Sequence, residues 1–478
     1  MNLRAGVPMS WVCKGRLAAL VFYFLITVGC GDVYRPTIIP NPVPTPDPKN
    51  FHAVIAVNQN TQFYPGTGMQ VDVSGDSNAG VTKVALGPVH ATLLNSRVWV
   101  ANNLSNSVSV FSPAGLGGSI GASTDINLPS GYNPVFVHST EAGTMYVANV
   151  SRADPTGAAG TVAAISAAGS IGNVVTNVIG VGKNPVAMAE TPDGKELYVV
   201  NRGDSNVTHI HTVDKTVAPG SIAVDASPSL AYARSDNQKV YVLNQGSGTI
   251  TTINTLDDSI AGTVSADAGA DFMIYDSHLN RLYVTSSTGS LYVYNAAVSA
   301  PTLLKQIPVP GASDCAQCTP VSVAALPDGS RVYVGSAVET TDSTKCVQPV
   351  GGPPVNCYLT QVTVIDALNL TAKTGSGTAP NPIPVPTPTS TAPAGVPVLL
   401  EANCATARFR LSMAAAGDSS RVFLAACDAG GISTINTASD TYVVTLPAPV
   451  SAFPPIQTDS NVAPQPPRQN PVFLLSGP

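Results

Sequence analysis

The chain has 478 residues, of which 44% are hydrophobic and only 11% are charged, with 41 glycines, 41 prolines and a formal net charge of −6. This composition favours strands and turns over helices, and no long window carries the apolar period of an amphipathic helix. The shortage of lysine and arginine argues against nucleic acid and against anionic lipid headgroups as partners.

The chain begins with a predicted signal peptide at residues 1–29. Arg4, Lys14 and Arg16 precede an apolar run over 17–29, which has the charge order and length of a secretory leader. This run is too short to span a bilayer, and no later stretch is long and apolar enough to do so. We therefore expect an exported chain with no transmembrane helix.

The leader ends in "ITVGC" (26–30), which resembles a bacterial lipobox, with Thr27 where the family prefers an aliphatic residue. The resemblance implies lipidation of Cys30, and an ordinary cleaved leader is the alternative. Gly31 follows the cysteine, so the aspartate that would signal inner-membrane retention is absent and an outer membrane is favoured. Residues 30–50 are rich in proline and predict an extended, lipid-anchored stalk.

A short strand motif recurs along the rest of the chain. Its copies are "VWVAN" (98–102), "MYVAN" (145–149), "LYVVN" (197–201), "VYVLN" (240–244), "LYVTS" (282–286), "VYVGS" (332–336) and "VFLAA" (422–426). Each copy is followed by a second strand that ends in a turn-forming residue, namely Ser112, Ser166, His211, Asn254, Asn295, Asp366 and Asn436 in turn. A recurring unit of this kind indicates a repeat architecture.

Several units also begin with a proline-led strand and a Pro-Asp-Gly turn, as in "KNPVAMAETPDGKELYVVN" (183–201), and end with a weaker strand such as "TNVIGVG" (176–182). Four antiparallel strands in 42–52 residues make one blade of a β-propeller. The motifs are similar to the YVTN-type β-propeller repeat family, which is related to surface-layer and lactonase-like propellers. The best match is 183–214, and the resemblance covers most of 52–478.

An eighth copy of the motif, "VIAVN" (54–58), opens the repeat region and is followed by candidate strands at 69–73 and 81–86. No proline-led strand precedes it. The chain ends in "NPVFLLSGP" (470–478), a near copy of the proline-led strand in "YNPVFVHST" (132–140). Because a ring of sheets must join its ends or expose an edge, we expect the last strand to complete the first blade.

The sequence thus predicts an all-β fold with a single β-propeller over 51–478. Eight strand sets favour eight four-stranded blades, with seven as the alternative. The spacing between motif copies is 42–52 residues except before the last, where it is 90. The excess predicts loop insertions near 340–358 and 372–398.

Six cysteines follow Cys30, and in an exported chain an even number predicts disulfides. Proximity favours pairing each with its neighbour, in the order Cys315–Cys318, Cys346–Cys357 and Cys404–Cys427. The motif "CAQC" (315–318) cannot attach c-type haem, because Thr319 rather than histidine follows it. No βαβ pattern surrounds the motif, so we expect no thioredoxin-like redox role. We also expect no zinc binding, since no further ligands are spaced suitably.

The histidines offer two candidate sites. His209 and His211 alternate along one strand and share a face, a geometry that can hold a metal, but no carboxylate is evident nearby and the repeat explains both as strand-end residues. His90 and His138 lie on proline-led strands, which such propellers turn toward their channel, and could act there as an acid–base pair.

A lactonase-like activity would need a cluster of arginine, glutamate or histidine at the channel mouth. Arg202, Asp204 and Glu190 are the charged candidates, but they match no catalytic motif, and no phosphate-binding or nucleophile motif is present. Catalytic residues are therefore unknown, and we expect no cofactor and no metal.

The leading prediction is an exported, lipid-anchored propeller that serves as a binding or scaffolding module at the cell envelope. Its partner would be an unknown protein or glycan, contacted through polar loops. A lactonase-like hydrolase and a passive surface-layer component are the alternatives.

Overall fold

The computed structural model describes residues 53–115, 119–140, 143–167, 173–311, 315–340, 357–375, 380–385, 404, 410–452 and 467–477. The predicted signal peptide and stalk, with Cys30, lie outside these residues, as do Cys346 and most of the two predicted insertions. Within the described ranges, no helix is long and apolar enough to cross a membrane.

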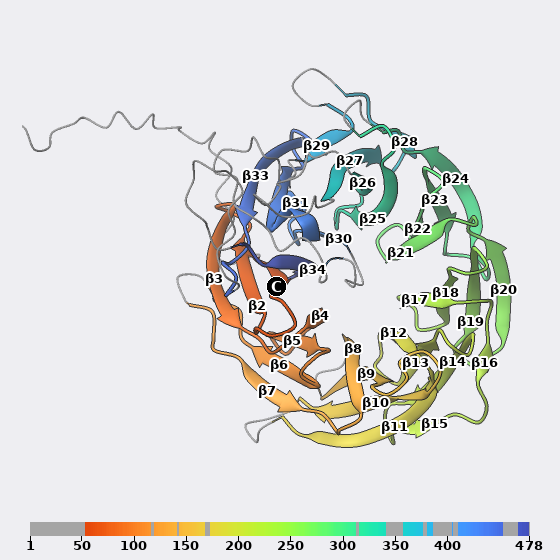
Figure 1. Ribbon diagram of the computed structural model, residues 1–478. Helices are drawn as coiled ribbons and strands as arrows, with labels where there is room; N and C mark the ends of the chain where they lie inside the picture. Colours follow the sequence, from red (N-terminus) through yellow and green to blue (C-terminus); the bar gives the residue numbers. More distant parts are fainter. Residues whose placement is uncertain are drawn as a thin grey trace, which may run out of the picture. The chain divides into compact units, whose positions relative to one another are not determined.

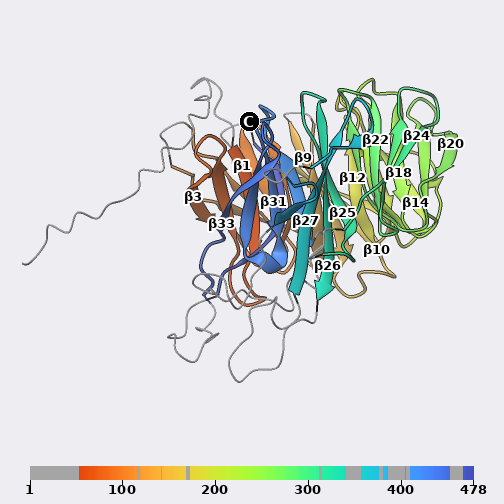
Figure 2. The same cartoon turned by 90° about the horizontal axis from the view of Figure 1, so that it is seen from above.

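Eight antiparallel sheets form a closed ring of blades around a central channel, as the view down the channel shows (Figure 1). The edge-on view shows the strands running between the two faces of the ring (Figure 2). Six blades have one strand at the channel and three further strands toward the rim, and in blades 4 and 7 two short strands share the outermost place. The fold is therefore the predicted all-β propeller, with eight blades rather than seven.

The strands of each blade are given from the channel outward. Blade 1 contains β34 (Asn470–Ser476), β1 (Ala53–Gln59), β2 (Thr67–Asp72) and β3 (Ser77–Lys83), and blade 2 contains β4 (Pro88–Leu94), β5 (Arg97–Asn102), β6 (Ser107–Phe111) and β7 (Thr124–Asn127). Blade 3 contains β8 (Tyr132–His138), β9 (Thr144–Ser151), β10 (Ala159–Ser166) and β11 (Val175–Lys183), and blade 4 contains β12 (Pro185–Glu190), β13 (Glu196–Asn201), β14 (Asn206–His211), β15 (Thr216–Val217) and β16 (Ile222–Ala223).

The second half of the ring repeats this order. Blade 5 contains β17 (Pro228–Ala233), β18 (Lys239–Asn244), β19 (Thr249–Asn254) and β20 (Ile260–Ser265), and blade 6 contains β21 (Ala270–Asp276), β22 (Arg281–Ser286), β23 (Ser290–Asn295) and β24 (Thr302–Pro308). Blade 7 contains β25 (Thr319–Ala325), β26 (Arg331–Thr340), β27 (Cys357–Asp366), β28 (Thr371–Ala372) and β29 (Ile383–Val385). Blade 8 contains β30 (Leu411–Ala415), β31 (Arg421–Ala426), β32 (Gly431–Asn436) and β33 (Thr441–Pro447), with the short 3-10 helix η1 (Cys427–Ala429) between β31 and β32.

The recurring motif forms the second strand of every blade, and its burial explains its composition. In β13 and β18 each residue after the first is buried, because neighbouring blades cover both faces of the sheet. The outermost strands are largely exposed, as in β24, which has a single buried residue. This decrease in burial toward the rim explains why the fourth strand of each unit has the weakest apolar pattern in the sequence.

Two details differ from the predicted strands. The strand predicted at 81–86 is β3 at Ser77–Lys83, because Asp72 closes a tight turn by accepting the Ser74 N–H at 3.0 Å and the strand resumes directly after it. The outermost strands of blades 4 and 7 are each split into two short segments.

The chain closes the ring as predicted. Strand β34 pairs antiparallel with β1, with Ala56 opposite Leu474 and Val57 opposite Phe473. The Thr67 hydroxyl also donates to the side-chain oxygen of Gln469 at 2.9 Å, across a separation of 402 residues. Blade 1 is therefore built from both ends of the propeller.

In four blades, a tyrosine of the motif donates a hydrogen bond to the next blade. The hydroxyl groups of Tyr241 and Tyr333 donate to the Ala296 carbonyl at 2.6 Å and to the Asp440 carboxylate at 2.6 Å, and both side chains are fully buried. A buried phenol needs a hydrogen-bond partner, and here the next blade supplies it. These bonds fix the position of neighbouring blades.

Two of the three predicted disulfides fall on described residues and are confirmed. Cys404 and Cys427 are bonded, with Cα atoms 5.7 Å apart, and Cys315 is bonded to Cys318. Cys357 begins β27, whereas Cys346 lies outside the described residues. The Cys346–Cys357 pair stays a prediction.

Candidate functional site

The innermost strands share an irregularity that shapes the channel. In seven of the eight blades, the pairing of the innermost strand with its neighbour shifts by one residue near the start of that strand. A proline stands at this place in most of them, as in Pro88, Pro134 and Pro185, and proline has no N–H to donate to the ladder. A β-bulge of this kind redirects the side chains that follow it.

The residue two positions after this proline, directly after the bulge, commonly lines a cavity of about 520 Å³ in the channel. Each blade contributes at least one lining side chain, among them Phe473, His90, Phe136, Ala187, Leu230, Phe272, Val323 and Ser412 in blade order. Most of the lining is aliphatic or aromatic. We refer to this space as the channel cavity, and its size is typical of small-molecule sites.

Three aromatic rings from three blades meet at one wall of the channel cavity. The His90 ring stacks on Phe136 with centroids 3.9 Å apart and lies 4.4 Å from the ring of Phe473. His90 is buried, and its Nδ1 accepts the backbone N–H of Val137 at 3.4 Å. Since Phe473 belongs to β34, this wall exists only when the ring is closed.

Two polar side chains of the lining, His138 and Glu190, lie on the adjacent blades 3 and 4. Burial lowers the pKa of His138 from 6.5 to about 4, so its imidazole is neutral near pH 7. Glu190 is buried, and its Oε2 accepts the backbone N–H of Thr140 at 2.6 Å. These groups can orient a ligand by hydrogen bonding.

The structure brings together only some of the residues considered from the sequence. His90, His138 and Glu190 all line the channel cavity. Arg202 and Asp204 do not line it, because they follow β13 at the end opposite the Glu190–Leu197 pair. There the Arg202 guanidinium donates to the Gln245 side chain at 3.1 Å, and the Asp204 carboxylate accepts the Lys183 N–H at 2.8 Å. Among the described residues that line the cavity, none is lysine or arginine.

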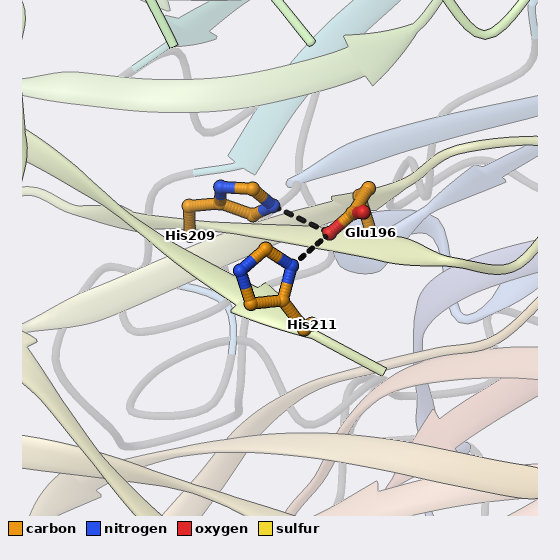
Figure 3. A group of neighbouring side chains, drawn as sticks. All are labelled: Glu196, His209 and His211. Atoms are coloured by element: carbon orange, nitrogen blue, oxygen red, sulfur yellow. Dashed lines mark hydrogen bonds and ion pairs between the residues drawn. The ribbon is translucent and has the colours of Figure 1, made fainter. Parts of the chain in front are cut away.

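A second group of polar side chains lies on blade 4 away from the channel cavity. Glu196 Oε2 is 2.6 Å from His209 Nε2 and 2.8 Å from His211 Nδ1 (Figure 3). The other ring nitrogen of His209 is 2.7 Å from Asp258 Oδ2, a residue of the β19–β20 turn in blade 5. We call Glu196, His209 and His211 the Glu196 cluster.

The expectation that no carboxylate lies beside His209 and His211 is wrong, since Glu196 bridges them. The sequence held a usable signal, because Glu196 begins β13 and pairs with His211, which ends β14. The interpretation of His211 as a turn residue is also incomplete. At the equivalent place, Asp366 and Asn436 accept backbone N–H groups of their turns at 2.9 Å, whereas His211 turns to Glu196.

No protein-family model and no curated protein matches the sequence. Among solved structures, the chain is similar to the dihydro-heme d1 dehydrogenase NirN in complex with DHE, with 12% identity, a TM-score of 0.53, and coverage of 84% of this chain and 74% of that one. A putative 6-phosphogluconolactonase from Bacteroides fragilis matches at 14% identity and a TM-score of 0.49, covering 69% of this chain and 95% of that one. Hydrazine synthase from Kuenenia stuttgartiensis matches at 16% identity and a TM-score of 0.45, covering 66% and 86%. At 12% identity, the likeness to NirN extends to the fold alone.

Proposed function

We propose that this chain is an exported, lipid-anchored binding module that holds a small, mainly apolar molecule in the channel cavity. The observation that carries the proposal is the cavity itself, at about 520 Å³ with a lining contributed by all eight blades. Specific sites for small molecules are usually concave and apolar, with few polar groups that fix orientation.

The chemistry of the lining restricts the ligand further. His90, Phe136 and Phe473 form an aromatic wall, on which a flat ring of a ligand can stack. Met188 and Met413 add flexible apolar surface that adapts to irregular shapes. With no lysine or arginine among the described lining residues, an anionic ligand would lack a counter-charge. A neutral aromatic molecule fits best.

The alternative, a lactonase-like hydrolase, has less support. The residues proposed for it do not assemble at the cavity, because Arg202 and Asp204 lie at the other end of β13 from Glu190. Glu190 is held by the Thr140 N–H, and His138 is neutral with little affinity for a proton near pH 7. We expect no hydrolysis of a panel of lactones and sugar lactones, and turnover that is lost in Glu190→Gln would favour this alternative.

The binding proposal can be tested with N-phenyl-1-naphthylamine, a neutral aromatic fluorophore. We expect saturable binding of one dye per chain. Ala233→Phe, which fills the cavity from β17, should weaken it at least tenfold, whereas Ala297→Phe, on an exposed turn, should leave it unchanged. Absence of saturable binding, or equal binding by both variants, would overturn the proposal.

Envelope attachment is a separate part of the proposal and rests on the sequence. If Cys30 carries the lipid, Cys30→Ser should move the protein from the membrane fraction to a soluble one, since acyl chains supply the attachment. Cys13→Ser, within the leader, is the matched control and should leave the protein on the membrane. A Cys30→Ser variant that stays membrane-bound would contradict the anchor. In the anchored protein, a protein or glycan of the envelope would bind the polar loops outside the cavity.

A further inference from the structure

The Glu196 cluster places three metal-binding atoms around one point. One ligand atom from each of Glu196, His209 and His211 lies within 4.8 Å of the others. Glu196 and His211 are half-buried and His209 is buried, so the group is partly exposed to solvent. Imidazole nitrogen and carboxylate oxygen are common ligands of zinc.

Asp258 sets the tautomer of His209. A carboxylate only accepts hydrogen bonds, so the contact of 2.7 Å between His209 Nδ1 and Asp258 Oδ2 requires a proton on Nδ1. In the neutral ring, Nε2 then carries a lone pair, and it faces Glu196 Oε2 at 2.6 Å. This is a hydrogen-bond distance, so the contact needs either a second proton, on Nε2, or a metal ion in the place of that proton. Metal-binding histidines typically donate their second N–H to a carboxylate in this way.

Comparison with other blade boundaries shows which charge is missing. At two boundaries an arginine at the start of the second strand pairs with an aspartate in the next blade, Arg421 with Asp76 at 3.0 Å and Arg331 with Asp440 at 3.2 Å. Asp258 occupies the same turn position as these aspartates, with a similar positive φ of 59°. Glu196 occupies the position of the arginines. The boundary between blades 4 and 5 therefore has two carboxylates where these two boundaries have an ion pair.

We propose that Glu196, His209 and His211 bind a divalent cation of the zinc class, which takes the place of the absent arginine and links blade 4 to blade 5 through Asp258. Asp214, whose charge interacts with His211, adds further negative potential. The solvent side of the cluster leaves a fourth position for water. This inference reverses the expectation of no metal, which was based on a histidine pair without a carboxylate.

The ion requires only a small rearrangement. With zinc about 2.0–2.1 Å from each ligand in tetrahedral geometry, the ligand atoms would stand about 3.3 Å apart. The present separations of 2.6 and 2.8 Å are those of hydrogen bonds. Rotation of the Glu196 and His211 side chains, both half-buried, can supply the difference.

The test uses the untagged full-length protein, purified in detergent, stripped with chelator and titrated with Zn²⁺ and with Co²⁺. We expect one tight site per chain, visible d–d absorption from bound Co²⁺, and a higher Tm in the presence of Zn²⁺. Glu196→Gln and His211→Ala should lose at least tenfold in affinity and lose the absorption band. His278→Ala, an exposed histidine outside the cluster, should behave as wild type.

Two further variants separate metal binding from general stability. Asp258→Asn keeps a residue suited to positive φ, and it should retain the stoichiometry while weakening affinity about 10–100-fold, as loss of an outer carboxylate does. Glu196→Arg introduces the arrangement found at Arg331 and Arg421, so its Tm should no longer respond to Zn²⁺. A wild-type protein that binds no zinc at micromolar concentration, or a Glu196→Gln variant that binds it equally, would overturn the inference; the first result would leave protons as the only cations in the cluster.

Discussion

Replacing Leu474 by alanine should weaken the closure of the ring. Leu474 is 4% exposed and packs with Val54, Ala56, Met69 and Phe423 in a core shared by blades 1 and 8. Deleting a buried leucine side chain to alanine costs about 2–5 kcal/mol, because the cavity left behind closes only partly. With an unfolding entropy of about 2.1 cal/mol/K per residue over the compact unit at 46–478, this corresponds to a decrease in Tm of roughly 2–5 °C.

The measurement is thermal unfolding followed by circular dichroism, with Leu256→Ala as the matched control. Leu256 is 95% exposed in a turn of blade 5, so its truncation should change stability by less than about 0.5 kcal/mol. Deletion of 469–478 should have a larger effect than Leu474→Ala, since it removes the whole of β34 and exposes the edge of β1. A Leu474→Ala shift no larger than that of the control would refute the reasoning.

Two more predictions concern cysteine and histidine. The double variant Cys404→Ser/Cys427→Ser should lose about 3 kcal/mol, because the disulfide closes a loop with a sequence separation of 23; an unchanged Tm under oxidising conditions would contradict this. His138 has a folded pKa of about 4 against 6.5 when unfolded, so its stabilising contribution is complete above pH 6.5 and is lost as the pH falls toward 4. Between pH 7 and 5 the wild type should therefore lose more in Tm than His138→Gln, and equal losses would show that His138 does not titrate as described.

Local sequence features determined most of the architecture. Alternation of aliphatic and aromatic residues in copies such as "LYVVN" identifies a strand buried on both faces, since only such a strand needs apolar side chains in both directions. Repetition at 42–52 residues then sets the blade, and the apolar C-terminal strand sets the closure. The Cys315–Cys318 and Cys404–Cys427 pairs also followed from the sequence, because each joins residues that antiparallel strands or a short turn already hold close.

The tertiary structure alone decided which side chains meet. His90, Phe136 and Phe473 come from three blades, and 337 positions separate Phe136 from Phe473, so no local pattern relates them. Glu196 could have been placed opposite His211 by strand register, but Asp258 reaches His209 only because blade 5 packs on blade 4. Repeats specify the blade they build, whereas a site between blades depends on the few positions at which one blade departs from the others.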